Sequence, residues 1–250
     1  DDVSITNVAD AAVTGLTVNA SRFAVTGQID TDTAGINIVA DDGGTATGTS
    51  ITLTGGAELN GQSMDLQAAS DVDFGGDIES VSGTPTVTIR GVADTTEMYL
   101  GESGGGVDVS EASLQRVQNS VSELIIGTAG TQTGLIQIEE NTDDTLTVNT
   151  PLTLNSAGAT GEINLNDNLT TGGTFTVNGS RASFNVDAGV GNNTLTVDTT
   201  GGDFILNDTI TFVNDGNDLA IVTSGGDVQI LGSVEANPGT LLEDLTISAG

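Results

Sequence analysis

The sequence predicts an all-β protein with a stacked, elongated architecture. Three observations lead to this prediction: apolar and polar residues alternate in short stretches along the whole chain, the stretches recur about every ten residues, and a long segment of the chain returns a second time. Strict alternation over three to five residues is typical of a strand with one buried face. We therefore expect residues 1–250 to form one continuous parallel β-helix of roughly 10–12 rungs, each containing two or three strands.

The expected strands are apolar–polar–apolar triplets, whose middle positions are mostly Thr, Asn, Asp or Ser, residues suited to an exposed strand face or its turns. In the first part of the chain the triplets are Val3/Ile5, Leu16/Val18, Phe23/Val25, Ile36/Ile38, Ile51/Leu53, Met64/Leu66, Val72/Phe74, Val87/Ile89, Met98/Leu100 and Val107/Val109. The series continues with Ile136/Ile138, Leu146/Val148, Leu152/Leu154, Ile163/Leu165, Phe175/Val177, Phe184/Val186, Leu195/Val197, Leu206, Ile210/Phe212, Leu219/Ile221, Val228/Ile230, Val234 and Leu245/Ile247.

The segments between these triplets are turns rich in Gly, Asn, Asp and Ser, such as residues 41–44 (DDGG) and 214–217 (NDGN). Strands at this spacing fit an antiparallel sandwich as well as a parallel β-helix. The alternative fold is therefore two antiparallel β-sandwich domains joined by residues 92–159. Very short strands, few tight two-residue hairpins and the long-range repeat favour the β-helix.

The long-range repeat is clearest where residues 17–22 (TVNASR) return as residues 176–181 (TVNGSR), a shift of 159. We interpret residues 1–91 and 160–250 as two copies of one block, with residues 92–159 as a spacer between them. A duplicated scaffold predicts a quasi-one-dimensional stack. The flanking aligned pairs are Leu16/Phe175, Ile36/Leu195, Ile51/Ile210, Val72/Val228 and Val87/Leu245.

One stretch has helical spacing, because apolar residues occur at Leu114, Val117 and Val121, with Ser110 as a candidate N-cap and no Gly within residues 110–121. The β-like flanks favour another irregular strand over a short helical turn. Asn residues recur beside the strands and would line up as ladders in stacked rungs, although turn preference explains them equally well. They are Asn19, Asn37, Asn149, Asn164, Asn178 and Asn185.

The charge balance excludes several classes of partner. The chain contains 35 Asp and Glu, four Arg and no Lys, for a net charge of −31. Nucleic-acid phosphates require Lys and Arg, so we expect no nucleic-acid partner. An anionic lipid surface repels an acidic protein, which disfavours adsorption to such a surface. No run approaches 18 apolar residues, so we expect no membrane insertion. An acidic, solvated surface and diffuse cation binding fit this composition.

Candidate metal ligands are Asp41, Asp42, Asp215 and Asp218, which lie in Asp/Gly turns that offer hard oxygen atoms to Ca²⁺. Neither turn matches the EF-hand loop or the calcium nonapeptide repeat, and turn chemistry alone places Asp, Asn and Gly there. We therefore expect at most weak Ca²⁺ sites and no other cofactor. Divalent cations or salt should raise stability mainly by screening like charges.

We expect no enzymatic activity. The chain has no His and no Cys, which excludes the usual acid–base residue, thiol chemistry and ordinary zinc sites. Neighbouring acids such as Asp143 and Asp144 would point to opposite faces of a strand or into water. The alternative function is a polysaccharide-binding or polysaccharide-cleaving β-helix, which needs a groove of exposed aromatic residues or several carboxylates. The chain has one Tyr and six Phe, mostly at core positions, so we expect no such groove.

Several segments resemble the repeats of filamentous-haemagglutinin-like secreted bacterial proteins: residues 218–234 (DLAIVTSGGDVQILGSV), and residues 114–117 (LQRV) followed by 123–127 (ELIIG) and 134–138 (GLIQI). The resemblance covers nearly the whole chain at the level of single repeats. It implies a right-handed parallel β-helix in a large exported surface protein or adhesin, located outside the cell or on the bacterial surface. It brings no catalytic residues.

We therefore expect a structural stalk or spacer, or a subunit that assembles into a surface fibre or layer. Expected partners are other copies of the chain or further coils of a larger chain, and surface glycans are a candidate ligand. The first residue is Asp1 and nothing in the chain resembles an export signal, so we expect a processed chain or a piece of a longer one.

Overall fold

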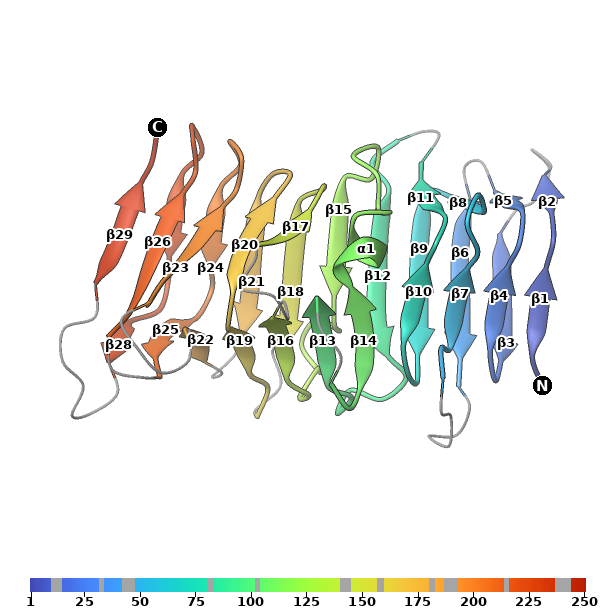
Figure 1. Ribbon diagram of the computed structural model, residues 1–250, viewed down its shortest axis with the longest axis horizontal. Helices are drawn as coiled ribbons and strands as arrows, with labels where there is room; N and C mark the ends of the chain where they lie inside the picture. The colour runs from blue at the N-terminus through green and yellow to red at the C-terminus, as the bar shows by residue number, and fades with distance from the viewer. Residues whose placement is uncertain are drawn as a thin grey trace.

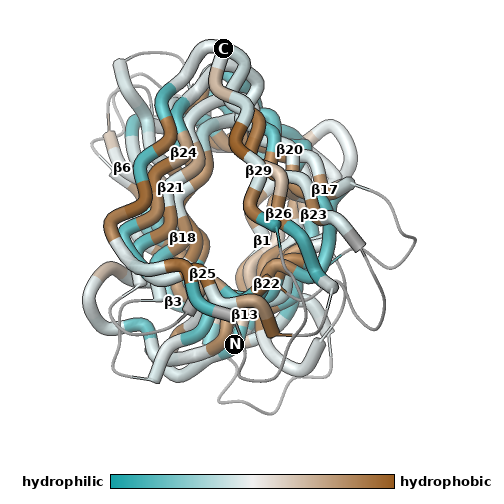
Figure 2. The backbone as a smooth tube through the Cα atoms, turned by 90° about the vertical axis from the view of Figure 1, so that its left-hand side faces the viewer, coloured by the Kyte–Doolittle hydropathy of each residue, from teal (hydrophilic) through white to brown (hydrophobic). Residues whose placement is uncertain are grey.

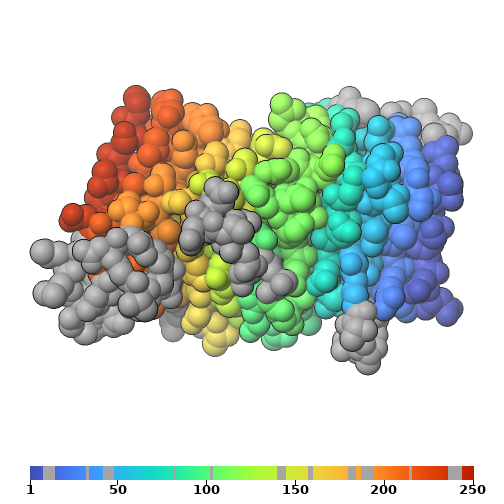
Figure 3. All heavy atoms as spheres, in the orientation of Figure 1, coloured from blue at the N-terminus to red at the C-terminus, as the bar shows by residue number. Residues whose placement is uncertain are grey.

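The protein is a parallel β-solenoid of about eight turns, with its two termini at opposite ends of the long axis (Figure 1). This computed structural model describes residues 1–9, 15–31, 34–41, 48–80, 83–101, 104–139, 145–156, 160–179, 183–186, 193–213, 216–236 and 244–250. All strand pairs in these residues are parallel, so the alternative of two antiparallel sandwiches is wrong. Figure 3 shows the coils stacked side by side in chain order along the rod.

Two long sheets form two faces of the solenoid. In spatial order, the eleven-stranded sheet contains β1 (Val3–Ile5), β4 (Phe23–Val25), β7 (Ile51–Leu53), β10 (Val72–Phe74), β14 (Val107–Ser110), β13 (Met98–Gly101), β16 (Ile136–Glu139), β19 (Ile163–Leu165), β22 (Ser183–Val186), β25 (Thr209–Phe212) and β28 (Val234–Ala236). The nine-stranded sheet contains β3 (Leu16–Ala20), β6 (Gly35–Ala40), β9 (Ser63–Ala68), β12 (Thr86–Gly91), β15 (Glu123–Ile126), β18 (Leu152–Ser156), β21 (Phe175–Gly179), β24 (Phe204–Leu206) and β27 (Val228–Ile230).

The third face is divided into two shorter sheets. A four-stranded sheet contains β2 (Val8–Ala9), β5 (Gln28–Asp30), β8 (Glu58–Asn60) and β11 (Asp77–Glu79). A five-stranded sheet contains β17 (Thr145–Val148), β20 (Asn168–Thr171), β23 (Asn193–Asp198), β26 (Asn217–Val222) and β29 (Leu245–Ser248). In each regular coil the chain forms first a strand of the eleven-stranded sheet, then a strand of one of these two shorter sheets, and then a strand of the nine-stranded sheet. Each regular coil therefore has three strands.

The coils vary in length, and some exceed the expected rung of ~20–25 residues. Val3 pairs with Phe23, 20 residues further on, but Val87 pairs with Leu124, 37 residues further on. One coil also contributes two strands, β13 and β14, to the same sheet. The number of strands in that sheet is therefore not the number of coils, and the chain completes about eight turns where 10–12 rungs were expected.

The core is a column of Val, Ile, Leu and Phe side chains that point inward from the strands. Alternation produces it directly: in β6, Ile36, Ile38 and Ala40 are buried while the residues between them are only partly covered. Figure 2, a view along the axis, shows the coils superimposed around this common interior. Each fully buried aliphatic or Phe side chain stabilises the fold by about 1.5–3 kcal/mol relative to leaving it exposed. Phe175 makes edge-to-face contacts with Phe184 and Phe204, at centroid distances of 6.3 and 5.8 Å.

The coil in the middle of the rod departs from this pattern. Strand β13 comes first in the chain, but β14 lies between β10 and β13, so the later strand occupies the position between β13 and the preceding coil. The backbone at Gly104, which precedes β14, lies over the outer face of β13: a Cβ on Gly104 would lie 2.3–2.4 Å from three ring carbons of Tyr99. Glycine is required here because the backbone rests directly on the ring.

After β14 the chain forms α1 (Glu111–Leu114), where an irregular strand was expected. The Ser110 hydroxyl accepts the Ser113 N–H and caps the helix, as its position suggested. Leu114 and Val117 are both buried, so the helical spacing of the apolar residues indicated the structure of this segment better than its β-like neighbours did. This segment replaces a strand on the third face: Val117 forms a bridge with Ile78 of β11.

The helical segment also contacts the five-stranded sheet, so it joins the two halves of the third face. The Glu111 carboxylate accepts the Thr147 N–H of β17 at 3.0 Å, and the Asn149 side chain donates to the Gln115 carbonyl at 3.0 Å. The Ser113 hydroxyl, itself buried, accepts the Phe74 N–H of β10 at 3.0 Å. Side-chain hydrogen bonds thus replace the missing backbone ladder.

The two proposed blocks do not occupy equivalent places in the solenoid. Leu16 and Phe175 both lie on the nine-stranded sheet, and Ile51 and Ile210 both lie on the eleven-stranded sheet. The other three aligned pairs fall on different faces; they are Ile36/Leu195, Val72/Val228 and Val87/Leu245. Short alternating strands resemble one another on every face, so an alignment can match strands that the coil places differently.

The repeated structural unit is the coil, and its clearest sign is a Thr-x-Gly-Gly corner at residues 199–202 and 223–226. The buried Thr223 hydroxyl donates to the Gly226 carbonyl at 2.6 Å, and Thr199 does the same to Gly202. The second position of each corner has a left-handed φ of 45°. A Cβ on Gly226 would lie 2.1 Å from the Gly202 carbonyl oxygen, so glycine lets successive corners stack closely.

Part of the expected Asn ladder is present. Asn178 donates to Asn155 at 2.9 Å and accepts from Asn207 at 2.7 Å, which forms a column over three coils. Asn185 donates to Asn164 at 2.7 Å. The other expected members do not stack on an Asn. Asn149 donates to the Gln115 carbonyl, Asn19 lies next to Val39 in the adjacent strand, and Asn37 lies between Thr17 and Asp65.

Candidate functional site

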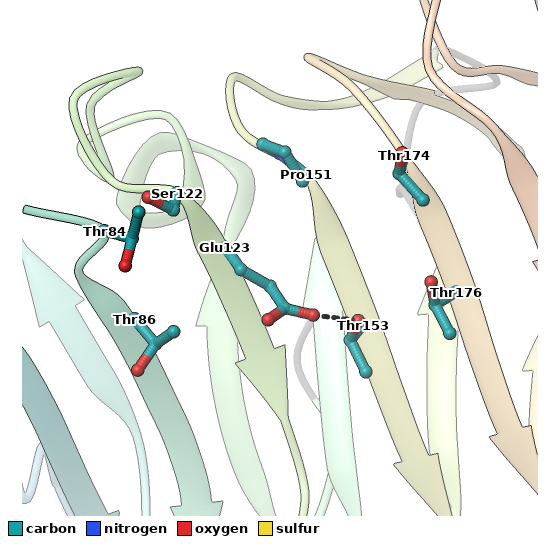
Figure 4. A pocket seen from close by; sticks show the side chains of 8 residues that line it. All are labelled: Thr84, Thr86, Ser122, Glu123, Pro151, Thr153, Thr174 and Thr176. Carbon is teal, nitrogen blue, oxygen red and sulfur yellow. Dashed lines mark hydrogen bonds between the residues drawn. The ribbon is translucent and has the colours of Figure 1, made fainter. Parts of the chain in front are cut away.

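The outer face of the nine-stranded sheet is hollowed along the rod, and we call this hollow the outer trough. The larger of its two parts has a volume of about 430 Å³ and crosses β12, β15, β18 and β21 (Figure 4). Hydroxyl groups dominate its lining, and Thr153 at its floor is 7 % exposed. The lining residues are Thr84, Thr86, Ser122, Glu123, Pro151, Thr153, Thr174 and Thr176.

A second part, of about 320 Å³, continues the trough across β3, β6, β9 and β12, and the two parts share Thr86. Small residues create the hollow here: Gly15, Gly35 and Ser63 occupy one outward-facing column where other coils carry larger side chains. The trough therefore results from the choice of Gly, Ser and Thr on an otherwise flat sheet.

The acidic side chains in the trough have partners. Arg90 donates to both carboxylate oxygens of Asp65, at 2.8 and 2.7 Å, and the hydrogen bond to Asp65 raises the pKa of the guanidinium against the opposing effect of burial. The Glu123 carboxylate accepts the Thr153 hydroxyl. A glycosidase usually places two carboxyl groups on either side of the bond that it cleaves. Asp65 and Glu123 lie on different strands and each bonds to a partner of its own, so they do not form such a pair.

Aromatic side chains contribute no flat exposed surface in the described residues. All six Phe are buried, at 2 % exposure or less. The single Tyr, Tyr99, is partly covered by the backbone of Gly104, and its hydroxyl donates to Glu97 at 2.7 Å. That hydrogen bond, with burial and the nearby acids, raises the pKa of Tyr99 to about 12. The expectation that aromatic residues would belong to the core is confirmed for Phe.

The candidate calcium ligands are not brought together as a site in the described residues. Asp42 and Asp215 lie outside these residues. Asp41 follows β6 at an exposed position, and Asp218 lies in β26, where one oxygen accepts the Asp244 N–H at 2.8 Å and the other accepts the Thr194 hydroxyl at 3.4 Å. No group of three or more acidic side chains in the described part of the chain could hold a metal ion.

Two carboxyl groups elsewhere are shifted in pKa. Burial raises the pKa of Asp108, against the opposing Gly104 N–H bond, and the nearby Asp71 raises it further. Burial also raises the pKa of Asp208, against the opposing Thr209 N–H bond. Asp108 lies on the outer face of β14, and Asp208 immediately precedes β25. Neither lies in the outer trough.

Sequence reasoning missed the outer trough, because it depends on which outward positions of successive coils are neighbours. The signal that could have found it is the coil register, in which Gly35, Ser63 and Thr86 fall on one column. Comparison with protein families, with curated proteins and with solved structures finds no match to this chain.

Proposed function

We propose that this chain is a structural spacer or stalk segment of an exported bacterial surface protein, or a subunit of a surface fibre or layer. The observation that carries the proposal is the uninterrupted eleven-stranded sheet, which extends from β1 to β28 over one apolar core. A rod held by backbone hydrogen bonds at every coil keeps its two ends a fixed distance apart.

The chemistry of the surface supports a structural role more than catalysis. The trough carboxylates Asp65 and Glu123 are partnered, and the chain has neither His nor Cys. Similarity to filamentous-haemagglutinin-like repeats, together with the acidic, cysteine-free composition, supports a location outside the cell or on the bacterial surface. The net charge of −31 disfavours nucleic acid as a partner. In the described residues, no helix has the length and apolarity needed to cross a membrane.

The proposal is tested by measuring the rigidity of the rod. Thr17 and Gln229 are exposed on the outer face of the nine-stranded sheet, at its two end strands β3 and β27. Because eight coil steps of ~4.8 Å separate these strands, spin labels on a T17C/Q229C variant should be ~38 Å apart, not counting linker lengths. The labelled chain is diluted with unlabelled chain, so that only distances within one molecule are measured.

A spacer gives one narrow distance distribution that is unchanged in low salt, in high salt and with Ca²⁺. A broad distribution, or one that moves by a coil step or more when ions change, would overturn the spacer function. The absence of Cys from the chain makes the two labels specific.

A second candidate function is glycan binding, which the hydroxyl lining of the outer trough favours. A neutral polysaccharide chain could hydrogen-bond to Thr86, Thr153 and Thr176 without needing a cation. The lack of an exposed aromatic platform in the described residues argues against it. Binding to a glycan panel, lost in a Thr153→Val variant but kept in a Thr246→Val variant, would establish it; Thr246 lies on the exposed strand β29 of another face.

A further inference from the structure

The outer face of the nine-stranded sheet is almost uncharged, although the chain carries a net charge of −31. The outward positions of its strands hold two acidic residues, Asp65 and Glu123, and one basic residue, Arg90. Arg90 and Asp65 form a salt bridge with an N–O distance of 2.7 Å. Glu123 is therefore the residue that gives the strands of this face their small net charge.

The described strands of the other faces are more acidic. Outward positions of the eleven-stranded sheet hold acidic residues and no basic residue; these are Asp73, Asp108, Glu139 and Glu235. The strands of the third face also hold only acidic charges, namely Asp30, Glu58, Asp77, Glu79, Asp198 and Asp218. A partner that covers carboxylates without pairing them removes their water at a cost in free energy. An uncharged partner therefore meets the lowest cost on the nine-stranded sheet.

The outer trough gives this face a direction. Its two parts meet at Thr86, and together they cross seven strands from β3 to β21, so the hollow runs along the rod. Six coil steps of ~4.8 Å make its length ~29 Å. A compact ligand would fill one part only, whereas a linear polymer laid along the rod occupies both. One coil step is comparable with the length of one sugar residue in an extended glycan.

Hydroxyl groups face the trough at successive coils. Thr86, Thr153 and Thr176 come from three different strands, and each hydroxyl can both donate and accept a hydrogen bond, as a sugar hydroxyl does. One oxygen of the Glu123 carboxylate accepts the Thr153 hydroxyl between β15 and β18, which leaves the other oxygen as an acceptor for a ligand hydroxyl (Figure 4). The ring of Pro151 and the Thr methyl groups supply apolar contact in place of an aromatic platform.

We propose that the outer trough binds an uncharged linear glycan that lies along the rod. This inference rests on the second candidate function, glycan binding, and names the class and the orientation of the ligand. Acidic glycans are excluded, because the Arg90 guanidinium already donates two hydrogen bonds to Asp65 and the rest of the rod repels anions. An extended peptide fits less well, since peptides gain affinity from strand edges and side-chain pockets rather than from a row of hydroxyl groups.

Titration calorimetry with defined oligosaccharides tests the ligand class. In a panel of cellohexaose, xylohexaose and mannohexaose, at least one should bind about tenfold or more tightly than its own disaccharide, because each added residue reaches another coil. Hexagalacturonate should bind about tenfold or more weakly at physiological ionic strength. A hexapeptide of threonine is the peptide control and should not bind.

Three results would overturn the inference while glycan binding stands: equal affinity for the acidic hexamer, affinity that is independent of length, or tighter binding of the peptide than of any glycan. If no glycan in the panel binds, the inference and the second candidate function fall together. The spacer function is decided separately, by the spin-label distances.

A pair of variants tests the place of binding. Thr86→Gln fills the point where the two parts of the trough meet, so the affinity for the hexasaccharide should fall about tenfold. The control is Thr211→Gln, at an equally half-buried outward position on the eleven-stranded sheet, which should leave the affinity unchanged. Circular dichroism of both variants checks that the fold is kept. Equal affinity in the Thr86→Gln variant and the natural sequence would overturn the inference.

Discussion

The regular coils that contain strands β17 to β29 and the central coil that contains β13, β14 and β15 are held together in different ways. Two successive regular coils use the same corner, Thr-x-Gly-Gly at residues 199–202 and 223–226, whose buried hydroxyl closes the turn and whose glycines let the next corner approach. The central coil uses unique contacts: a backbone loop on Tyr99, the inserted strand β14 and the capped helix α1. Repetition spreads stability over many equal contacts, whereas the central coil concentrates it in a few side chains.

The largest expected effect tests that concentration. Replacing Leu114 of α1 by Ala should cost about 2–5 kcal/mol, since the side chain is fully buried and leaves a cavity. The matched Leu219→Ala variant, in regular strand β26, should cost a similar amount. Hydrogen exchange should distinguish them: loss of protection should reach both β11 and β17 in the first variant and stay within β23, β26 and β29 in the second. Identical exchange patterns would contradict the comparison.

A smaller effect should arise from crowding at a regular corner. Gly202→Ala places a Cβ 2.1 Å from the Thr174 backbone nitrogen, so the stacked corners must separate, at a cost of about 1–3 kcal/mol. The control is Gly105→Ala in the central return loop, where the added Cβ meets no atom within 4 Å. Denaturant unfolding should show a lower midpoint for the first variant only. Equal midpoints would mean that the corners are not closely stacked.

A still smaller effect concerns backbone strain. Ser224 has a left-handed φ of 45°, which disfavours residues with a Cβ, so Ser224→Gly should stabilise the protein by about 0.5–1 kcal/mol. Thr200 has the same φ, but its hydroxyl donates to the Thr171 carbonyl at 2.6 Å. Thr200→Gly should therefore gain less or lose stability. Thermal unfolding compares the two, and a larger gain at Thr200 would contradict the reasoning.

The smallest expected effect depends on pH. Burial, with the neighbouring Asp71, raises the pKa of Asp108 in the folded protein above its unfolded value. The folded protein thus favours the protonated form of Asp108. The stability that this form contributes is fully present below the unfolded pKa, and it is lost as pH rises through the folded pKa because the carboxyl group then ionises. Asp108→Asn should modestly raise the melting temperature at pH 7 and have little effect near pH 3. A difference that is independent of pH would contradict this assignment.

The sequence predicted most strands that carry two inward apolar residues, because alternation over three positions is visible without knowledge of the fold; it missed β15, where Leu124 and Ile126 are buried. It missed strands such as β5, β8 and β11, each of which buries one aliphatic residue, namely Ile29, Leu59 or Ile78. One apolar residue cannot define an alternation. The prediction at α1 was wrong because it gave more weight to the β-like sequences on either side than to the helical spacing of Leu114, Val117 and Val121. The outer trough could not be found, since it depends on coil register, which no single strand encodes.

The order of strands β10, β14, β13 and β16 in the sheet has a consequence for how the chain folds. A solenoid can grow by adding each new strand to the edge left by the previous coil. Strand β13 cannot join in this way, because both of its neighbours, β14 and β16, come later in the chain than β13 itself. Growth from the N-terminal side must therefore pause after β12 until β13 and β14 have formed a pair, which then docks on β10 as a unit. During synthesis, the first four coils would be complete and waiting while this pair assembles, so the central coil sets the pace of the rod.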